Sequence, residues 1–191
     1  MIVAGVEAGG TKFVLGLFRI SGTGAELPEL LWRESIPTLV PEDTLGKAVG
    51  LIAEAGKSWG RPEALGIGCF GPVELREGNP AWGRVTSTPK PGWRGADVAG
   101  ILGRGLGLKA AFDTDVNAAA AGEWRWGAGR GLQDFIYVTI GTGIGGGVVS
   151  GGRLVHGAAH PELGHIRIAR EASDSYAGHC PYHGPCLEGL A

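Results

Sequence analysis

Residues that could bind a metal ion are concentrated towards the C-terminal end of this sequence. All five histidines and two of the three cysteines fall within residues 156–191. A cysteine, a histidine and a second cysteine follow one another there at three-residue intervals, and another histidine precedes them. Four nitrogen and sulfur donors complete the closed tetrahedral shell of a structural Zn²⁺. The predicted zinc ligands are His165, Cys180, His183 and Cys186.

Two alternatives to this zinc site stay open. His179 is another histidine within reach, although its side chain would be strained beside that of its neighbour Cys180. A chance cluster of polar loop residues is the second alternative. A metal clip suits this segment because it holds few apolar residues that could order it by packing.

Two glycine-rich segments each lie between short apolar runs that are typical of strands. The first is Gly9-Gly10-Thr11-Lys12, and the second begins with Gly141-Thr142-Gly143 and continues to Gly147. Glycine lets backbone N–H groups approach an oxyanion closely, while Thr and Lys add a hydroxyl and a charge. An ordinary hairpin turn would explain the first segment alone. Two such turns in one chain favour a pair of phosphate-binding hairpins.

A third candidate site joins the end of a predicted strand to the start of a predicted helix, at Asp113-Thr114-Asp115-Val116-Asn117. Asp and Asn are common helix caps, so capping alone would account for them. The functional interpretation is general-base catalysis, in which a carboxylate accepts the proton of a hydroxyl that attacks a γ-phosphate. A helix N-terminus favours the ionised carboxylate that this role needs.

Short strands and helices in an α/β order must position these residues. Periodicity predicts strands at 2–7, 12–18, 30–36, 64–70, 109–113, 134–140 and 147–149. It predicts helices at 43–53, 96–106 and 117–126. Asp43 is the expected cap of the first helix. Residues 71–95 are too long for a plain connection and are expected to form a functional loop. A strand, a glycine turn and a strand occur twice, which indicates two related lobes, 1–127 and 128–191.

Composition and charge narrow the class of protein. A net charge of -2 and a pI of about 6.2 give no basic footprint for nucleic acid or an anionic membrane. The chain has no apolar run of transmembrane length and no secretion signal after Met1, so we expect a cytoplasmic protein. Three cysteines argue against a disulfide framework, and Cys69, in an apolar strand, is predicted to be a packing residue.

In their order and spacing, these motifs resemble those of the ROK family of sugar kinases over essentially the whole chain. The matching stretches are Glu7–Lys12, Phe70–Pro72, Asp115–Ala119, Gly141–Gly147, Glu162–His165 and Cys186–Gly189. The resemblance implies an α/β, actin-like (ribonuclease H-like) ATPase fold with one complete lobe and an incomplete second lobe. It also implies that the chain is truncated at its C-terminus, before the residues that hold adenosine. Because an uncovered half-lobe invites pairing, we expect a homo-oligomer, specifically a dimer.

The resemblance further implies a role for individual residues. Asp115 would be the catalytic base, and Glu7 would hold Mg²⁺ through water. The two glycine turns would hold the phosphates of ATP. The expected sugar contacts are Thr88, Lys90, Asp115, Glu162, His165 and Glu188. His165 would bind zinc through one ring nitrogen and face the sugar with the other, and we expect the zinc loop to leave the phosphate turns untouched.

Four departures from the usual family pattern are similar to the bacterial fructokinase branch. Glu7 stands where most members have Asp, and Thr114 where they have Asn. The sugar loop is Thr88–Trp93 in place of Asn-Leu-Pro-x-Trp, and the zinc loop has Cys-Pro-Tyr-His in place of Cys-x-Cys-Gly. Fructose is therefore the expected substrate. Glucokinase or mannokinase activity, or an inactive zinc-stabilised sugar-binding fragment, are the alternatives.

Overall fold

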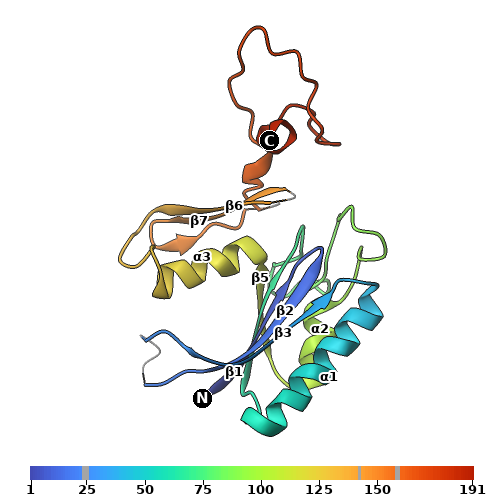
Figure 1. Cartoon of the computed structure of the whole chain (residues 1–191), viewed down its shortest axis with the longest axis vertical. Helices are drawn as coiled ribbons and strands as arrows, with labels where there is room; N and C mark the ends of the chain where they lie inside the picture. Colours follow the sequence, from blue (N-terminus) through green and yellow to red (C-terminus); the bar gives the residue numbers. More distant parts are fainter. Residues whose placement is uncertain (23–25, 142, 158–159) are drawn as a thin grey trace. The chain divides into compact units, whose positions relative to one another are not determined.

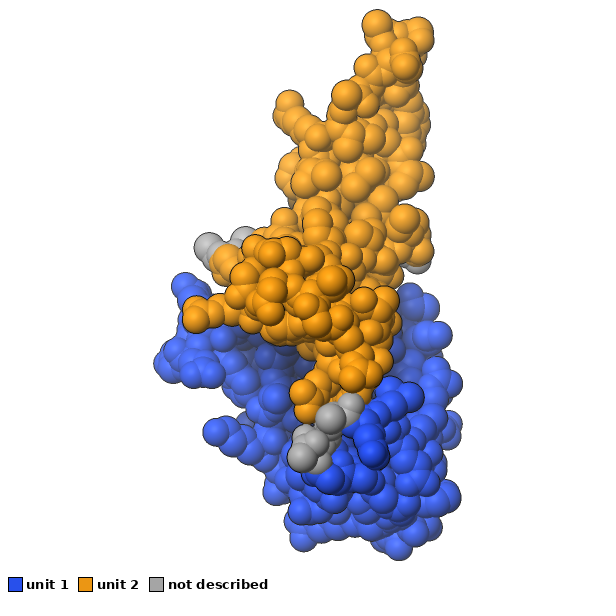
Figure 2. Space-filling view, turned by 90° about the vertical axis from the view of Figure 1, so that its left-hand side faces the viewer, with its two compact units in different colours: residues 1–118 blue, residues 119–191 orange. Residues whose placement is uncertain are grey.

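The computed structural model of the chain describes residues 1–22, 26–141, 143–157 and 160–191 (Figure 1). It contains two compact units, Met1–Ala118 and Ala119–Ala191, which Figure 2 colours separately. The sequence predicted the boundary between the lobes after residue 127, just past the end of helix α3 (Asp115–Trp126). The boundary between the compact units falls within this helix, after Ala118. The assignment of lobes therefore stays a prediction.

A five-stranded sheet of order β3-β2-β1-β4-β5 forms the first unit. Its strands are β1 (Ile2–Ala8), β2 (Lys12–Arg19), β3 (Glu29–Pro37), β4 (Ala64–Cys69) and β5 (Ala110–Thr114). Strand β2 pairs with β1 and β3 in antiparallel fashion, whereas β4 pairs in parallel with β1 and β5. The sequence predicted all five strands, and these predictions are confirmed with ends that differ by a single residue.

One face of this sheet carries the core of the first unit. Alternate residues of three neighbouring strands are buried on it, namely Ala4, Val6, Ala8, Phe13, Leu15, Leu17, Leu65, Ile67 and Cys69. Helices α1 (Pro41–Trp59) and α2 (Val98–Leu106) pack on each other and on the sheet (Figure 1). Removing this apolar surface from water is the main stabilising term of the unit. The intervening residues of each strand are thereby turned to the opposite face, where Glu7 and Asp113 lie.

Helix α1 begins at Pro41, so the prediction that Asp43 caps it is wrong. Val40 precedes the helix with an extended backbone (φ -68, ψ 151) and makes no side-chain cap. Proline suits the first helical position because its ring fixes φ and its missing N–H is not needed there. Asp43 lies in the first turn instead, where a carboxylate interacts favourably with the helix dipole.

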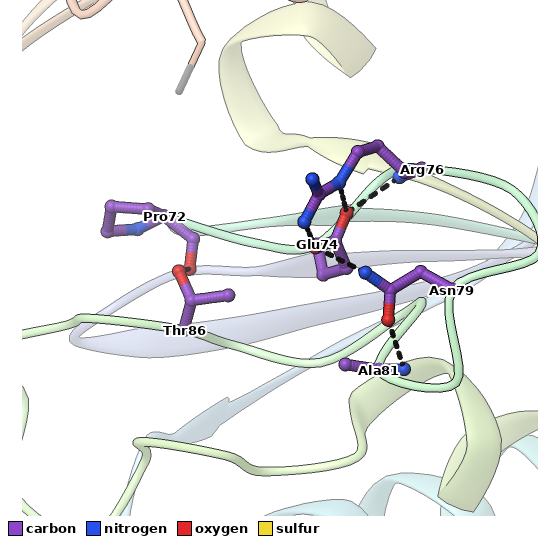
Figure 3. A network of polar contacts seen from close by, with 6 residues as sticks. All are labelled: Pro72, Glu74, Arg76, Asn79, Ala81 and Thr86. Atoms are coloured by element: carbon purple, nitrogen blue, oxygen red, sulfur yellow. Dashed lines mark hydrogen bonds and ion pairs between the residues drawn. The ribbon is translucent and has the colours of Figure 1, made fainter. Parts of the chain in front are cut away.

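A buried carboxylate orders the long loop of residues 71–95. Glu74 accepts hydrogen bonds from the backbone N and Nε of Arg76, both at 2.9 Å, and from Asn79 Nδ2 at 3.0 Å (Figure 3). Asn79 Oδ1 in turn accepts from the N–H of Ala81 at 2.9 Å. Because each buried polar group has a partner, this loop holds a defined shape without helix or strand of its own.

The second unit contains a three-stranded antiparallel sheet of order β6-β7-β8. Its strands are β6 (Phe135–Ile140), β7 (Ile144–Ser150) and β8 (Arg153–Leu154). Strand β7 starts three residues earlier than predicted, because the last glycines of the 141–147 run pair within the strand. A short 3₁₀ helix, η1 (Leu163–His165), and helix α4 (Leu187–Leu190) follow. In the described part of the chain, no helix is both long and apolar enough to cross a membrane.

Candidate active site and metal centre

The first glycine turn connects β1 to β2 and is held from one side by Thr38. The N–H of Gly9 donates to Lys12 O (3.0 Å), and the hydroxyl of Thr38 donates to Gly9 O (2.7 Å). The N–H of Thr38 donates to Thr11 O at 2.9 Å. A Cβ atom at Gly9 would lie only 2.7 Å from Lys12 O, so the turn requires glycine there. Gly10, Thr11 and Lys12 are exposed, as an anion-binding turn requires.

Two carboxylates flank Gly68 on the face of the sheet opposite the core. Gly68 in β4 is in register with Glu7 in β1 and with Asp113 in β5. Residues in register on neighbouring strands share a face, so Glu7 and Asp113 lie on either side of Gly68. A Cβ atom at Gly68 would lie 3.3 Å from the Cα of Asp115 and 2.7 Å from the Cβ of Ala118. Gly68 therefore lets the start of α3 approach this row closely.

Thr114, rather than either aspartate, caps helix α3. Its hydroxyl accepts a hydrogen bond from the N–H of Asn117 at 3.1 Å, which is the geometry of an N-cap. Asp113 Oδ1 accepts from Asn117 Nδ2 at 2.9 Å, and the Asn117 side chain is fully buried. Asp115 occupies the first helical position, and its Oδ1 accepts from the N–H of Val116 at 2.9 Å. The capping explanation thus belongs to Thr114, and the half-buried Asp115 sits where the helix dipole favours its charged form.

Cys69 is a packing residue. It is fully buried at the end of β4, and this burial raises the pKa of its thiol far above the ordinary value. The negative charge of Asp115 raises the pKa further. A thiol that stays protonated is neither a nucleophile nor a metal ligand.

Trp93 anchors the loop that carries the predicted sugar contacts Thr88 and Lys90 to the core of the first unit. Its indole is fully buried, and Nε1–H donates to Leu39 O at 2.8 Å. Its ring centroid lies 5.5 Å from that of Phe13 and 5.3 Å from that of Phe70. Within the loop, Thr88 Oγ1 accepts from the N–H of Lys90 at 3.2 Å. Both predicted contacts therefore lie close together on a segment anchored to the core.

The second glycine turn lies between β6 and β7 and is closed by a hydrogen bond from Gly141 N to Gly143 O of 2.9 Å. Thr142, which the sequence assigned to phosphate binding, lies outside the described residues. The N–H of Ile144, the first residue of β7, donates to Glu188 Oε2 at 2.8 Å. Glu188 belongs to α4, so this turn is joined to the helix that follows the cysteines.

The four predicted zinc ligands come together in the second unit. One donor atom from each of His165, Cys180, His183 and Cys186 lies within 4.8 Å of every other. The Nδ1 of His165 is 3.7 Å from the sulfur of Cys180 and 3.6 Å from that of Cys186, and His183 Nδ1 is 3.9 Å from Cys180. Such spacings match the edges of a tetrahedron whose bonds are about 2.0 to 2.3 Å long.

Opposing effects act on the pKa of the Cys180 thiol. Burial acts to raise its pKa, but the backbone N–H groups of Tyr182 and His183 hydrogen-bond the sulfur and lower the pKa overall. A thiolate is the form that binds a metal, so this pKa shift suits a ligand. His179 is exposed, and among the described residues it is not part of the cluster.

The predicted sugar contacts of the second unit surround the same cluster. Glu162 Oε2 lies 3.9 Å from the Nε2 of His165, the nitrogen turned away from the cysteines. Glu162 holds a left-handed backbone (φ 45, ψ 47), which is uncommon for a residue other than glycine and is typical of functional positions. Glu162, His165 and Glu188 thus lie on the two short helices that flank the metal centre.

Sequence reasoning missed several of the residues that shape these sites. Gly68 carried one available signal, a glycine inside a strand, which suggests close approach by another part of the backbone. The bond from Ile144 to Glu188 carried none, because it depends on how segments 44 positions apart fold together. The bond between Asn117 and Asp113 is local, but the sequence presented both residues as candidate helix caps rather than as partners.

Comparison with known proteins assigns this chain to a protein family. A sequence model of the ROK family matches residues 3–191. A fructokinase of Zymomonas mobilis is 44% identical over 188 residues, which cover 97% of this chain and 60% of that protein. The chain therefore spans about 60% of the length of the curated relatives that it matches.

Solved structures agree with this placement. The ROK hexokinase of Thermus thermophilus superposes with a TM-score of 0.75 at 32% identity, over 100% of this chain and 60% of that one. A ROK family glucokinase of Streptomyces griseus, solved with glucose and AMPPNP, has a TM-score of 0.74 at 30% identity, over 99% of this chain and 55% of that one. The fold is therefore the actin-like ATPase fold of these kinases, and the chain belongs to the ROK family.

Proposed function

We propose that this chain is an ATP-dependent sugar kinase that transfers the γ-phosphoryl group to the 6-hydroxyl of fructose. The observation that carries the proposal is family membership together with 44% identity to a fructokinase, against 30% to 34% to glucokinases. The four motif departures described above favour the same branch. Fold similarity alone does not choose between hexoses, since one fold hosts many substrates.

Asp115 acts as the general base in this reaction. Its carboxylate accepts the proton of the 6-hydroxyl while the oxygen forms a bond to the γ-phosphorus and the bond to the ADP oxygen breaks. The position of Asp115 at the first residue of α3, close to Gly68, supports this role. Asp113 serves instead to hold Asn117, which secures the helix that carries the base.

The exposed carboxylate of Glu7 suits a magnesium partner that acts through water. Mg²⁺ keeps several water ligands and uses one or two carboxylates together with substrate phosphates. Glu7 is the second-last residue of β1, two positions before Gly9 of the first glycine turn. Cation and phosphates would therefore be held by adjacent groups of one hairpin, and Mg²⁺ would neutralise charge on the phosphates.

A structural Zn²⁺ fits the cluster of the second unit, because two nitrogen and two sulfur donors lie within 4.8 Å of one another. His165, Cys180, His183 and Cys186 would hold the ion. Zinc would supply local order here rather than chemistry on the substrate. The proposed sugar contacts of this unit are Glu162, His165 and Glu188, and those of the first unit are Thr88, Lys90 and Asp115.

Assays of ADP release by this chain with fructose, mannose, glucose and N-acetylmannosamine test the proposal. We expect fructose to give the highest kcat/KM. A rate with glucose tenfold above that with fructose would overturn the fructokinase assignment and leave a glucokinase. A rate with mannose above that with fructose would point to a mannokinase in the same way.

An inactive zinc-stabilised sugar-binding fragment is the second candidate. The observation in its favour is that the chain spans about 60% of the length of its relatives. Isothermal titration with fructose, with and without AMPPNP, separates the two candidates. Heat from both ligands supports the kinase, whereas heat from fructose and none from AMPPNP supports the fragment.

A further inference from the structure

Glu188 ties the helix after the cysteines to the second glycine turn. Its Oε2 accepts the N–H of Ile144 at 2.8 Å, although the two residues are 44 positions apart in the sequence. Ile144 is the first residue of β7 and directly follows Gly143 in the turn. The orientation of the peptide group that leaves the turn is therefore set by one carboxylate.

Two glycines make this contact possible. A Cβ atom at Gly143 would lie 2.6 Å from Glu188 Oε2, so glycine at this position leaves room for the carboxylate to reach the turn. A Cβ atom at Gly164 would clash with the carbonyl oxygen of Ile144. Gly164 directly precedes the metal ligand His165 in η1. The start of β7 thus packs against η1 at backbone distance, and η1 in turn contacts α4, so close packing can transmit small displacements between them.

The position of Glu188 is in turn fixed by the metal loop. Cys186 is the N-cap of α4, and its sulfur accepts the N–H of Gly189 at 3.4 Å. The N–H of His179 donates to Gly189 O at 2.9 Å, and that of Leu187 donates to Ile166 O at 2.9 Å. Glu188 therefore lies between residues that are bonded to both ends of the predicted metal loop.

We propose that Glu188 is a positioning residue through which metal occupancy of the cluster sets the geometry of the second phosphate turn. A metal bound by His165 and Cys186 would hold η1 and α4 together, and Glu188 would then hold the turn in its phosphate-binding shape. The link to nucleotide rests on the proposed kinase function. It also revises the expectation that the zinc loop leaves the phosphate turns untouched. Since Oε2 is committed to Ile144, we assign the proposed sugar contact of Glu188 to Oε1.

Amide hydrogen exchange of Ile144 tests the coupling directly, by NMR on the 191-residue chain loaded with Zn²⁺ and again after chelation. Glu188→Ala should lower protection of this amide roughly ten- to hundredfold, the effect of losing a hydrogen bond to a charged acceptor. Glu188→Gln retains an acceptor oxygen and should keep most of the protection. Chelation should lower protection in the unmodified chain and add little in Glu188→Ala.

Glu171→Ala is the matched control, because Glu171 is an exposed glutamate of the same unit, and it should leave Ile144 unchanged. Protection of Val14, inside β2, reports that the first unit stays folded. Unchanged protection of Ile144 in Glu188→Ala, or after chelation of the unmodified chain, would overturn the proposal. The chelation arm decides the question even where Glu188→Ala fails to fold.

Titration with AMPPNP extends the test to the phosphate turn. Chelation should weaken AMPPNP binding to the unmodified chain about tenfold, and Glu188→Ala should bind as weakly with or without metal. If the zinc-loaded chain does not bind AMPPNP, the kinase function fails while the exchange of Ile144 still tests the coupling. If AMPPNP binds equally well before and after chelation, the kinase function stands and the coupling is wrong.

Discussion

His165 and Glu162 face each other across 3.9 Å, measured from Nε2 to Oε2. The other ring nitrogen, Nδ1, lies between the sulfurs of Cys180 and Cys186. A histidine that binds a metal through Nδ1 carries its proton on Nε2. Because 3.9 Å is too long for a direct hydrogen bond, a hydroxyl oxygen has room to accept from His165 and donate to Glu162.

Glu162→Gln should therefore weaken fructose binding roughly three- to tenfold, because a hydrogen bond to a charged acceptor becomes a neutral one. Zinc content should stay at the level of the unmodified chain, since Glu162 is not a ligand. Titration calorimetry measures the affinity and elemental analysis the metal. Glu171→Gln, at an exposed loop position, should change neither quantity. Fructose affinity unaltered by Glu162→Gln would remove this residue from the sugar site.

Asp115→Asn should leave folding nearly intact and lower kcat by about 10²–10⁴, because the amide cannot accept the proton of the attacking hydroxyl. The helix cap survives, since Thr114 provides it. Asp113→Asn should cost much less in rate and more in stability, because it disturbs the bond to the buried Asn117. Steady-state kinetics and thermal unfolding distinguish the two roles. A lowered melting temperature with normal turnover in Asp115→Asn would make Asp115 a structural residue.

The strands and the metal cluster were within reach of sequence reasoning because their signals are local. Alternation of apolar residues, as in Val6 and Ala8, marks a half-buried strand without knowledge of its partners. Cys180, His183 and Cys186 stand within seven residues of one another, so their spacing alone brings them together. The start of α1 was missed because Pro41 fixes it, and a carboxylate in the first turn resembles a cap.

The relations between distant segments were beyond such reasoning. Glu7 and Asp113 flank Gly68 only because two parallel pairings fix their register, which no local pattern states. The bond from Ile144 to Glu188 likewise depends on packing between segments far apart in the sequence. The length of β7 was underestimated because glycines that permit close packing look the same as glycines that form a turn. Cytoplasmic location and dimer formation stay predictions.

Asp134 should have a pKa below its ordinary value of about 3.9. The N–H of Gly151 and the hydroxyl of Ser150 both donate to its charged form and lower the pKa. The stability that Asp134 contributes is therefore present above the unfolded pKa and is lost as the pH falls through the folded pKa. Asp134→Asn should be less stable than the unmodified chain at pH 7, and the difference should close in acid. NMR titration of the carboxyl carbon of Asp134 gives its pKa. Ser150→Ala removes one of the two donors and should move the pKa partly back towards its ordinary value. An ordinary pKa in the unmodified chain would show that these hydrogen bonds do not stabilise the charged form.

Trp93→Phe should destabilise the first unit by about 1–3 kcal/mol, because the fully buried indole loses apolar volume together with its hydrogen bond to Leu39 O. The fructose KM should rise as well, since Trp93 anchors the loop of Thr88 and Lys90. Urea unfolding and steady-state kinetics measure the two effects. Trp59→Phe, at an exposed position at the end of α1, should stay within about 0.5 kcal/mol and leave KM unchanged. Equal behaviour of the two variants would exclude Trp93 as an anchor.

One Zn²⁺ should be bound per chain, and each cysteine of the cluster should be needed for it. Cys180→Ser and Cys186→Ser remove a thiolate, the ligand that zinc prefers, and should release the metal. His183→Ala should weaken zinc binding, whereas His179→Ala should retain it, since His179 lies outside the cluster. Elemental analysis of the purified variants measures the metal content directly. Absence of stoichiometric zinc from the unmodified chain would end the claim, and zinc retained by Cys186→Ser would end this set of ligands.

Zinc release should also lower the order of residues 156–191 more than that of the first unit. Little apolar surface is buried in this segment, so metal ligation is its main source of order, worth on the order of 10 kcal/mol in favourable peptides. Hydrogen exchange should therefore rise around Gly184 and Gly189, whose N–H groups are bonded to Cys180 O and Cys186 Sγ. It should stay unchanged in β1, β2 and β4, which pack on their own core. Equal loosening of both units after chelation would show instead that zinc stabilises the chain as a whole.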